Sequence, residues 1–171
     1  VPETGYTDVV FALSSMVFTA GASLYAFNLN AQPVLRVFQG GRGKIMSGRD
    51  ANALHLRANP GHNPPYKDFS IAAESRLKHN EEYVRFYSPA EGCILRRAWI
   101  MRASDARGLS AQQIANKWSM PNPPTHVADV RAGGALARVG PARGNFGWDG
   151  GGVQIELLDF NEVQFVNPRP I

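Results

Sequence analysis

The sequence predicts an α+β fold with a twisted, mainly antiparallel β-sheet core, a few short helices and an N-terminal helical segment. Short apolar segments, several of them alternating with polar residues, recur along the chain. The 17 glycines and 12 prolines separate these segments with turns and leave little room for long helices. An apolar fraction of 44% over 171 residues is typical of one globular domain with a sizeable core.

The first part of the chain is uncharged. No Asp, Glu, Lys or Arg occurs in residues 9–35, and within them the run VVFALSSMVFTAGASLYAF is nearly as long as the roughly 20 residues that span a bilayer. The Ser, Thr and Gly residues of this run make a membrane span a weaker interpretation. A signal peptide requires a basic region before its apolar run, and none precedes this one. We interpret residues 1–32 as a helical segment or linker before a domain of residues 33–171. Membrane contact is expected only through residues 9–29.

The elements that follow are short. A glycine turn ends the first expected strand, and prolines assign residues 57–69 to a loop. A charged helix is expected over residues 71–83, where Glu74 precedes Lys78 by four positions. A second helix begins with Ser110 as its cap and Gln113 as the partner in a capping box, and it stops before Pro121. The expected strands are residues 34–38, 84–88, 93–101, 124–131 and 153–158.

Strand periodicity assigns side chains to faces. In the strand over residues 124–131, His126 shares one face with Ala128 and Val130. In the last strand, Gln154 and Glu156 share the face opposite to the apolar residues. Two polar side chains therefore lie together just after the stretch GNFGWDGGG.

The glycine triplet Gly150–Gly152 suggests close contact between main chain and ligand. Glycine accepts positive φ and has no Cβ, so a ligand can approach the backbone, and successive amides can form an anion site. The alternative is a wide hairpin turn. Trp148, inside this turn, is a candidate to cover an aromatic ring.

The composition also bears on disulfides, metal sites and the charge of the ligand. A single cysteine, Cys93, excludes an internal disulfide and a cysteine-based zinc cluster. No ligands cluster near His55 and His62 at useful spacing, so no metal site is expected. The net charge of +4 fits an anionic ligand and equally an ordinary globular protein.

Several motifs resemble one family in the same order along residues 76–157, about half of the chain. FGWDGGGVQ has the form F-G-x-x-G-G-G-x-Q and resembles the signature of the tuberculosis-necrotizing-toxin domain family, whose members hydrolyse NAD⁺ to nicotinamide and ADP-ribose. RFYSPAEG resembles its aromatic-x-Ser-Pro-x-Gly segment, RRA its Arg-Ala element, and THVADV its Tyr-His-Val strand. The stretch between Arg97 and His126 is longer than the family pattern implies.

The resemblance implies a site. Gln154, His126 and Arg97 would be catalytic, with Arg96 as the alternative to Arg97. The upstream family arginine falls on Arg76 or Arg85. The implied substrate-binding residues are Arg76, Arg85, Phe86, Tyr87, Phe146, Trp148, Gly150, Gly151, Gly152 and Glu156.

The resemblance also implies where the protein acts, on which substrate and with which partner. The chain would be the C-terminal toxin domain of a bacterial polymorphic toxin, secreted and delivered into the cytoplasm of a target cell. Its substrate would be NAD⁺ or NADP⁺, with no cofactor and no metal, and its partner a dedicated immunity protein. Nucleic acid is not expected as a partner.

Two alternatives stay open. Gln154 and Glu156 form a Gln-x-Glu element that resembles the catalytic element of ADP-ribosyltransferases. The chain could instead be a non-catalytic binding module or a ribonuclease. Basic residues would then bind the ligand, and His126 with His55 would form the acid–base pair. The basic residues considered for that role are Arg36, Arg42, Lys44 and Arg49.

Overall fold

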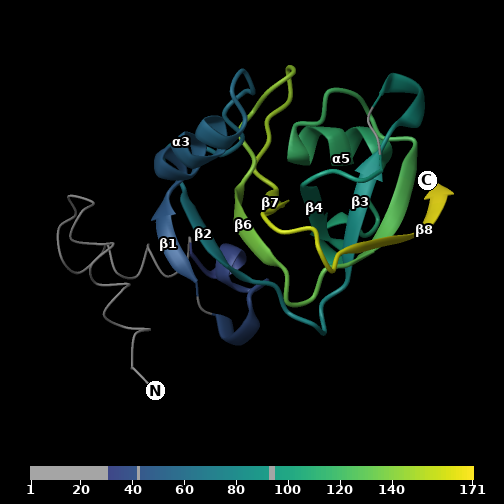
Figure 1. The fold of residues 1–171 in the computed structure, drawn as a ribbon. Helices are drawn as coiled ribbons and strands as arrows, with labels where there is room; N and C mark the ends of the chain where they lie inside the picture. The colour runs from purple at the N-terminus through teal and green to yellow at the C-terminus, as the bar shows by residue number, and fades with distance from the viewer. Residues whose placement is uncertain (1–30, 42, 93–94) are drawn as a thin grey trace.

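The computed structural model describes residues 31–41, 43–92 and 95–171 (Figure 1). The expected N-terminal segment lies outside the described residues up to residue 30, as do Arg42 and Cys93.

One antiparallel sheet dominates the described residues and confirms the expected α+β fold (Figure 1). Its strand order is β1-β2-β6-β7-β4-β3-β5-β8, and every pair of neighbours is antiparallel. The strands are β1 (Lys44–Ser47), β2 (Ile71–Arg76), β3 (Tyr83–Tyr87), β4 (Trp99–Arg102), β5 (His126–Arg131), β6 (Leu136–Pro141), β7 (Val153–Leu157) and β8 (Gln164–Pro170).

Short helices accompany the sheet. In Figure 1, α3 and α5 stand at the two sides of the connection between β6 and β7. Residues 31–35 are also helical. The described helices are the 3₁₀ turns η1 (Gln39–Gly41) and η2 (Pro89–Glu91), and the α-helices α3 (Gly48–Ala58), α4 (Ala103–Ala106) and α5 (Ala111–Trp118).

The two faces of the sheet bury different side chains. On one face, Ile155 and Val130 belong to an apolar cluster that Val34 and Phe38 cover. On the other face, α5 packs through Trp118, and α3 packs through Ala51. Because both faces are covered, polar residues in the strands are buried as well as apolar ones.

The expected strand over residues 34–38 is wrong. Residues 31–35 are helical, and Phe38 makes only an isolated bridge to Leu77. Val34, Val37 and Phe38 are fully buried. Val34 lies in this helix, whereas Val37 and Phe38 lie in the turn and bridge that follow it, so the segment is held by burial of its side chains and not by strand pairing.

The expected helix over residues 71–83 is also wrong, because Ile71–Arg76 form β2. Glu74 pairs with Arg138 of the neighbouring strand β6 instead of Lys78. Ala72 and Ala73 favour a helix by intrinsic propensity, but both are completely buried between sheet neighbours. Tertiary packing decides the conformation of this segment.

Other elements were predicted correctly from local sequence patterns. The Ser110 side chain accepts from the Gln113 amide and the Gln113 side chain accepts from the Ser110 amide, so the capping box of α5 is confirmed. Strands β3, β5 and β7 are confirmed, and β4 begins at Trp99, later than expected. The sequence did not predict β1, α3, α4, β6, β8 or the 3₁₀ turns η1 and η2.

Candidate active site

Gln154 and His126, two predicted catalytic residues, lie on opposite faces of the sheet. Ile155 and Val130 pack in the same apolar cluster. His126 is four residues from Val130 in β5 and shares its face, whereas Gln154 is next to Ile155 in β7 and points the other way. His126 lies instead beside Tyr87, with ring centroids 5.5 Å apart. The structure does not bring Gln154 and His126 together.

The same alternation separates His126 from His55, the acid–base pair of the ribonuclease hypothesis. His55 is buried on α3 and hydrogen-bonds to Glu156, which shares the face of Gln154. The pair is therefore not assembled as expected, because the sheet lies between its members.

The four candidate arginines lie in different parts of the structure and do not form one cluster of contacts. Arg76 donates to the Gly134 carbonyl at 2.9 Å, and buried Arg85 donates to the Trp99 carbonyl at 3.0 Å. Arg97 is exposed in the bend before β4. Its alternative, Arg96, is also exposed and donates to the Phe160 carbonyl at 3.4 Å.

The glycine triplet is committed to internal contacts. The amides of Gly150 and Gly152 donate to the Asn116 and Lys117 carbonyls of α5, at 2.9 and 2.8 Å. The Gly151 amide donates to the Ala142 carbonyl at 2.8 Å. These three donors are therefore occupied, and the turn has the structure of a wide hairpin packed on a helix end. This is the alternative to the expected anion site.

The aromatic candidates also differ in their surroundings. Phe86 is buried and stacked with Trp118, their ring centroids 6.5 Å apart, as a core residue. Phe146 is 56% exposed and has a positive φ of 56°. Trp148 is half-buried, and its Nε1 is a buried donor without a hydrogen-bond partner among the described residues.

A buried polar cluster surrounds Glu156, which is only 4% exposed. Its Oε1 lies 2.6 Å from His55 Nδ1. Its Oε2 accepts from the Tyr66 hydroxyl at 2.9 Å and from Arg138 Nη1 at 3.0 Å. The position of this carboxylate is therefore set by α3, the loop before β2, and β6.

The cluster contains one more negative group than positive groups. Arg138 also binds Glu74, through Nη2 at 2.7 Å and Nε at 2.8 Å. Burial, and then the negative charge of Glu156 beside it, raise the pKa of Tyr66 well above its ordinary value, so its hydroxyl stays protonated and donates. The cluster thus contains two carboxylates and one guanidinium.

A second histidine continues the cluster toward the surface. His62 Nδ1 lies 3.3 Å from His55 Nε2, and the two ring centroids are 5.4 Å apart. His55 is buried and His62 is exposed. The Trp99 ring lies 5.5 Å from that of His55. A continuous series of polar groups therefore joins buried Glu156 to solvent.

Gln154 is held on the same face as this cluster. It is 8% exposed, and its Nε2 donates to the Pro65 carbonyl at 2.8 Å. Pro65 belongs to the loop that carries His62. That loop is anchored to α3, because Asn52 hydrogen-bonds to both the amide and the carbonyl of Tyr66 at 2.8 Å.

Tyr66 and Arg138 were not predicted as site residues, and His55 was predicted only as the partner of His126 in the ribonuclease alternative. A local signal existed for α3, since the Ser47 hydroxyl caps the helix by accepting from the Asp50 amide at 3.1 Å. No local signal joins His55 to Glu156, which is 101 residues away.

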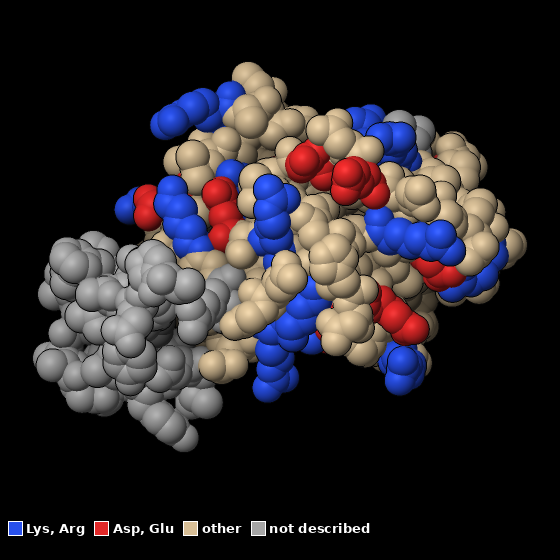
Figure 2. All heavy atoms as spheres, turned by 60° about the horizontal axis from the view of Figure 1, so that its bottom comes forward, with Lys and Arg blue, Asp and Glu red and all other residues tan. Residues whose placement is uncertain are grey.

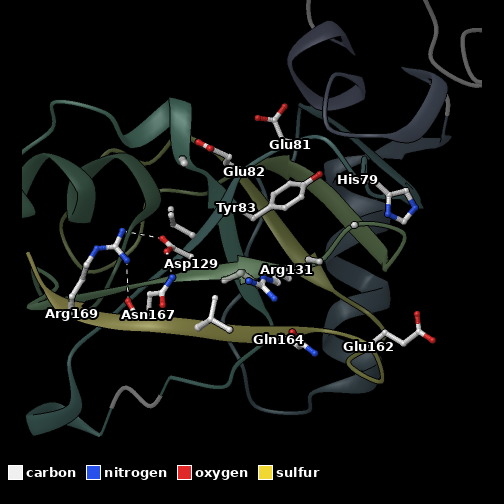
Figure 3. A pocket seen from close by; sticks show the side chains of 16 residues that line it. His79, Glu81, Glu82, Tyr83, Asp129, Arg131, Glu162, Gln164, Asn167 and Arg169 are labelled. Atoms are coloured by element: carbon white, nitrogen blue, oxygen red, sulfur yellow. Dashed lines mark hydrogen bonds and ion pairs between the residues drawn. The ribbon is translucent and has the colours of Figure 1, made fainter.

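A separate hollow of about 760 Å³ lies beside β3, β5 and β8 (Figure 3). Arg169 and Asn167 hydrogen-bond to Asp129 at its wall and lower the pKa of that carboxyl. None of the predicted site residues lines this hollow. Its lining mixes acidic residues (Glu81, Glu82, Asp129, Glu162) with basic ones (Arg131, Arg169).

Among the described residues, no group of three or more His, Cys, Asp or Glu side chains could hold a metal ion. None of their helices has the length and apolar character needed to cross a bilayer.

No protein-family model and no curated protein matches the chain. Among solved structures, the chain is similar to one described as "Structure of Tne2 in complex with Tni2", with a TM-score of 0.45 and 13% sequence identity. The similarity covers 58% of this chain and 92% of that chain. A likeness at this level carries no argument about activity or substrate.

Proposed function

We propose that this chain is a toxin domain that hydrolyses NAD⁺ at the nicotinamide–ribose bond, giving nicotinamide and ADP-ribose. One observation carries the proposal: Gln154 and Glu156 lie on the same face of β7, each fixed by hydrogen bonds. Two positions along a strand separate them by roughly 7 Å. The motif F-G-x-x-G-G-G-x-Q, which ends at Gln154, supports the same reaction.

The chemistry of the bond suits an exposed amide oxygen of Gln154 with the Glu156 carboxylate fixed behind the site. Breaking it builds positive charge on the ribose, which a nearby amide or carboxylate oxygen stabilises. Nicotinamide leaves as a neutral molecule, so no general acid is required. Because Gln154 Nε2 donates to Pro65, the Oε1 of this amide is the atom left to accept from a ribose hydroxyl.

The remaining parts of the dinucleotide require donors and an aromatic surface. Arg97 and Arg96 are exposed directly before β4, and a planar guanidinium suits linked phosphates better than an ammonium. Trp99, half-buried beside His55, provides an aromatic wall next to Glu156. We assign the phosphates to these arginines and the nicotinamide ring to Trp99.

Nicotinamide release tests the proposal. Purified chain is incubated with NAD⁺ and, separately, NADP⁺, and free nicotinamide is quantified by chromatography. Gln154→Ala should lower kcat by roughly 10²–10³-fold, as expected for the loss of one oxygen that stabilises the transition state. Gln164→Ala, on an exposed position of β8, is the matched control and should retain full activity. Absence of nicotinamide release by the unchanged chain at micromolar concentration would overturn the proposal.

An ADP-ribosyltransferase is the second candidate, favoured by the shared face of Gln154 and Glu156. Because Glu156 is buried with three partners, its replacement would disturb folding as well as chemistry. The products discriminate better. With NAD⁺ labelled in the adenine, a hydrolase leaves the label in free ADP-ribose, whereas a transferase leaves it on a macromolecule.

An enzyme of this kind would deplete the NAD⁺ of the cell that makes it. We therefore propose a dedicated inhibitor protein, together with secretion and delivery into the cytoplasm of a target cell. No cofactor or metal is needed for the proposed reaction. A nucleic-acid substrate is disfavoured on the face drawn in Figure 2, where acidic and basic side chains are interspersed.

A further inference from the structure

The hydrogen bonds around His55 determine where its proton lies. An ionised carboxylate only accepts, so Glu156 Oε1 requires a proton on His55 Nδ1, 2.6 Å away. The Nε2 of neutral His55 is then an acceptor, and the 3.3 Å contact requires a proton on His62 Nδ1. In the neutral state both imidazoles are therefore Nδ1–H tautomers. The Nε2 of His62, an exposed side chain, is left with a free lone pair.

We propose that His62 is the general base of the reaction and that His55 and Glu156 are positioning residues behind it. The inference rests on the proposed function. A water molecule gives a proton to His62 Nε2, and its oxygen electron pair forms the new bond to the ribose C1′. The C1′–nitrogen bond breaks, and its electron pair leaves with nicotinamide, which becomes neutral. Exposed His62 then returns the proton to solvent.

The position of the loop supports this role. The loop that carries His62 also provides the Pro65 carbonyl that holds Gln154. The Asn59 side chain donates to the His55 carbonyl at 3.0 Å, and the His62 amide donates to the Asn59 carbonyl at 3.2 Å. The base and the amide are thus fixed relative to one another by the same short segment.

The charges behind the base offset the positive charge that it gains when it takes the proton of water. The groups that face the two histidines are Glu156 from β7 and Tyr66 from the adjoining loop, with Arg138 of β6 and Glu74 of β2 behind them. Tyr66 is neutral, so two carboxylates face one guanidinium. One imidazolium makes the cluster electrically balanced, and the adjoining carboxylate stabilises it, as in other carboxylate–histidine pairs.

The tautomers can be measured without any substrate. Long-range ¹⁵N–¹H NMR spectra of the neutral imidazoles are recorded on the whole chain and assigned with the His55→Gln and His62→Gln variants. We expect the Nδ1–H form at both positions, the reverse of the usual preference of free histidine. An Nε2–H tautomer at His55 would overturn the proposal, because the relay to Glu156 would not exist.

The kinetic test separates this inference from the proposed function. His62→Gln should lower kcat for nicotinamide release by roughly 10²–10⁴-fold with little change in KM. A base acts when unprotonated, so the rate of the unchanged chain should fall at acidic pH, and His62→Gln should lose that acidic limb. His79→Gln, also an exposed histidine, is the control and should keep both rate and profile.

The outcomes are distinct. An active parent chain with a His62→Gln variant of equal kcat and unchanged pH profile would overturn the role of His62 and leave the proposed function standing. A parent chain that releases no nicotinamide would overturn both.

Discussion

Ile155 and Glu156 are neighbours in β7, yet they point into two different environments. Ile155 is completely buried in an apolar cluster with Val139 and Leu157. Glu156 is almost as buried, but it contacts His55, Tyr66 and Arg138 through hydrogen bonds and an ion pair. One face of the sheet is thus an ordinary core, and the other contains a buried charged cluster.

This difference indicates what each face contributes. Apolar burial contributes about 25 cal/mol per Å² to stability and is the main favourable term in folding. A buried ion pair, by contrast, seldom stabilises a protein more than apolar residues of similar volume would. We therefore assign stability mainly to the Ile155 face and reactivity to the Glu156 face.

Glu156→Ala should have the largest effect on stability. It removes the acceptor of His55 and Tyr66 and leaves Arg138 with Glu74 alone, and breaking a buried pair in this way costs about 3–5 kcal/mol. Urea unfolding of the variant and the parent measures the difference. A loss below about 1 kcal/mol would mean that water already screens the cluster and that the two faces differ less than described.

Gly152→Ala should have the next largest effect on stability. It tests whether the glycine turn is packed tightly against α5. An added Cβ would lie 2.8 Å from both the Lys117 carbonyl oxygen and Trp118 Nε1. Overpacking of this kind costs about 1–3 kcal/mol. Thermal unfolding measures the loss. An unchanged melting temperature would indicate that the turn moves freely on α5 and that its amides are available to a ligand after all.

Ile155→Val should have a smaller effect, confined to the apolar face. Removing one methylene from a packed core costs about 0.5–1.5 kcal/mol. Urea unfolding should show this loss, with nicotinamide release unchanged. A lowered kcat would show that packing on this face controls the geometry of Glu156, and the division between the two faces would fail.

Asp129→Asn should have the smallest effect, because its ion pair with Arg169 is exposed and is worth about 0.2–1 kcal/mol. The pKa of Asp129 is lowered in the folded state by hydrogen bonds from Arg169 and Asn167. Its contribution is therefore present above the ordinary carboxyl pKa and is lost as pH falls through the lowered one. The variant should be slightly less stable than the parent at pH near 7, and this difference in unfolding free energy should shrink as the pH falls below the ordinary carboxyl pKa, as checked by urea unfolding. If the variant and the parent differed in unfolding free energy by the same amount in acid as at pH near 7, the ionised Asp129 carboxylate would not be the source of the difference.

Local sequence signals predicted elements whose conformation is decided locally. The Ser110 capping box specifies where α5 begins, and the period-2 pattern after the glycine turn gives β7 and the shared face of Gln154 and Glu156. Residues 71–76 were misassigned because their helix propensity is overridden by pairing with β1 and β6. That pairing is not encoded within the segment.

The candidate site was predicted only in part for the same reason. Gln154 and Glu156 are close in sequence, so their relation follows from strand geometry. His55 and Glu156 meet because α3 packs on the sheet. His126 and Gln154 are separated because side-chain alternation along β5 and β7, in the register of the assembled sheet, points them to opposite faces. Contacts of this kind depend on the assembled fold, which motif spacing does not reveal.

The most direct test of the central claim compares nicotinamide release and unfolding free energy for Glu156→Gln and Ile155→Val prepared side by side. Glu156→Gln keeps the volume of the side chain but disturbs the tautomer of His55, and we expect kcat to fall by at least roughly tenfold in a variant that is less stable than the parent but still folded without denaturant. Ile155→Val should lose stability and keep kcat. A Glu156→Gln variant with the kcat of the parent would contradict the assignment of the reaction to this face of the sheet.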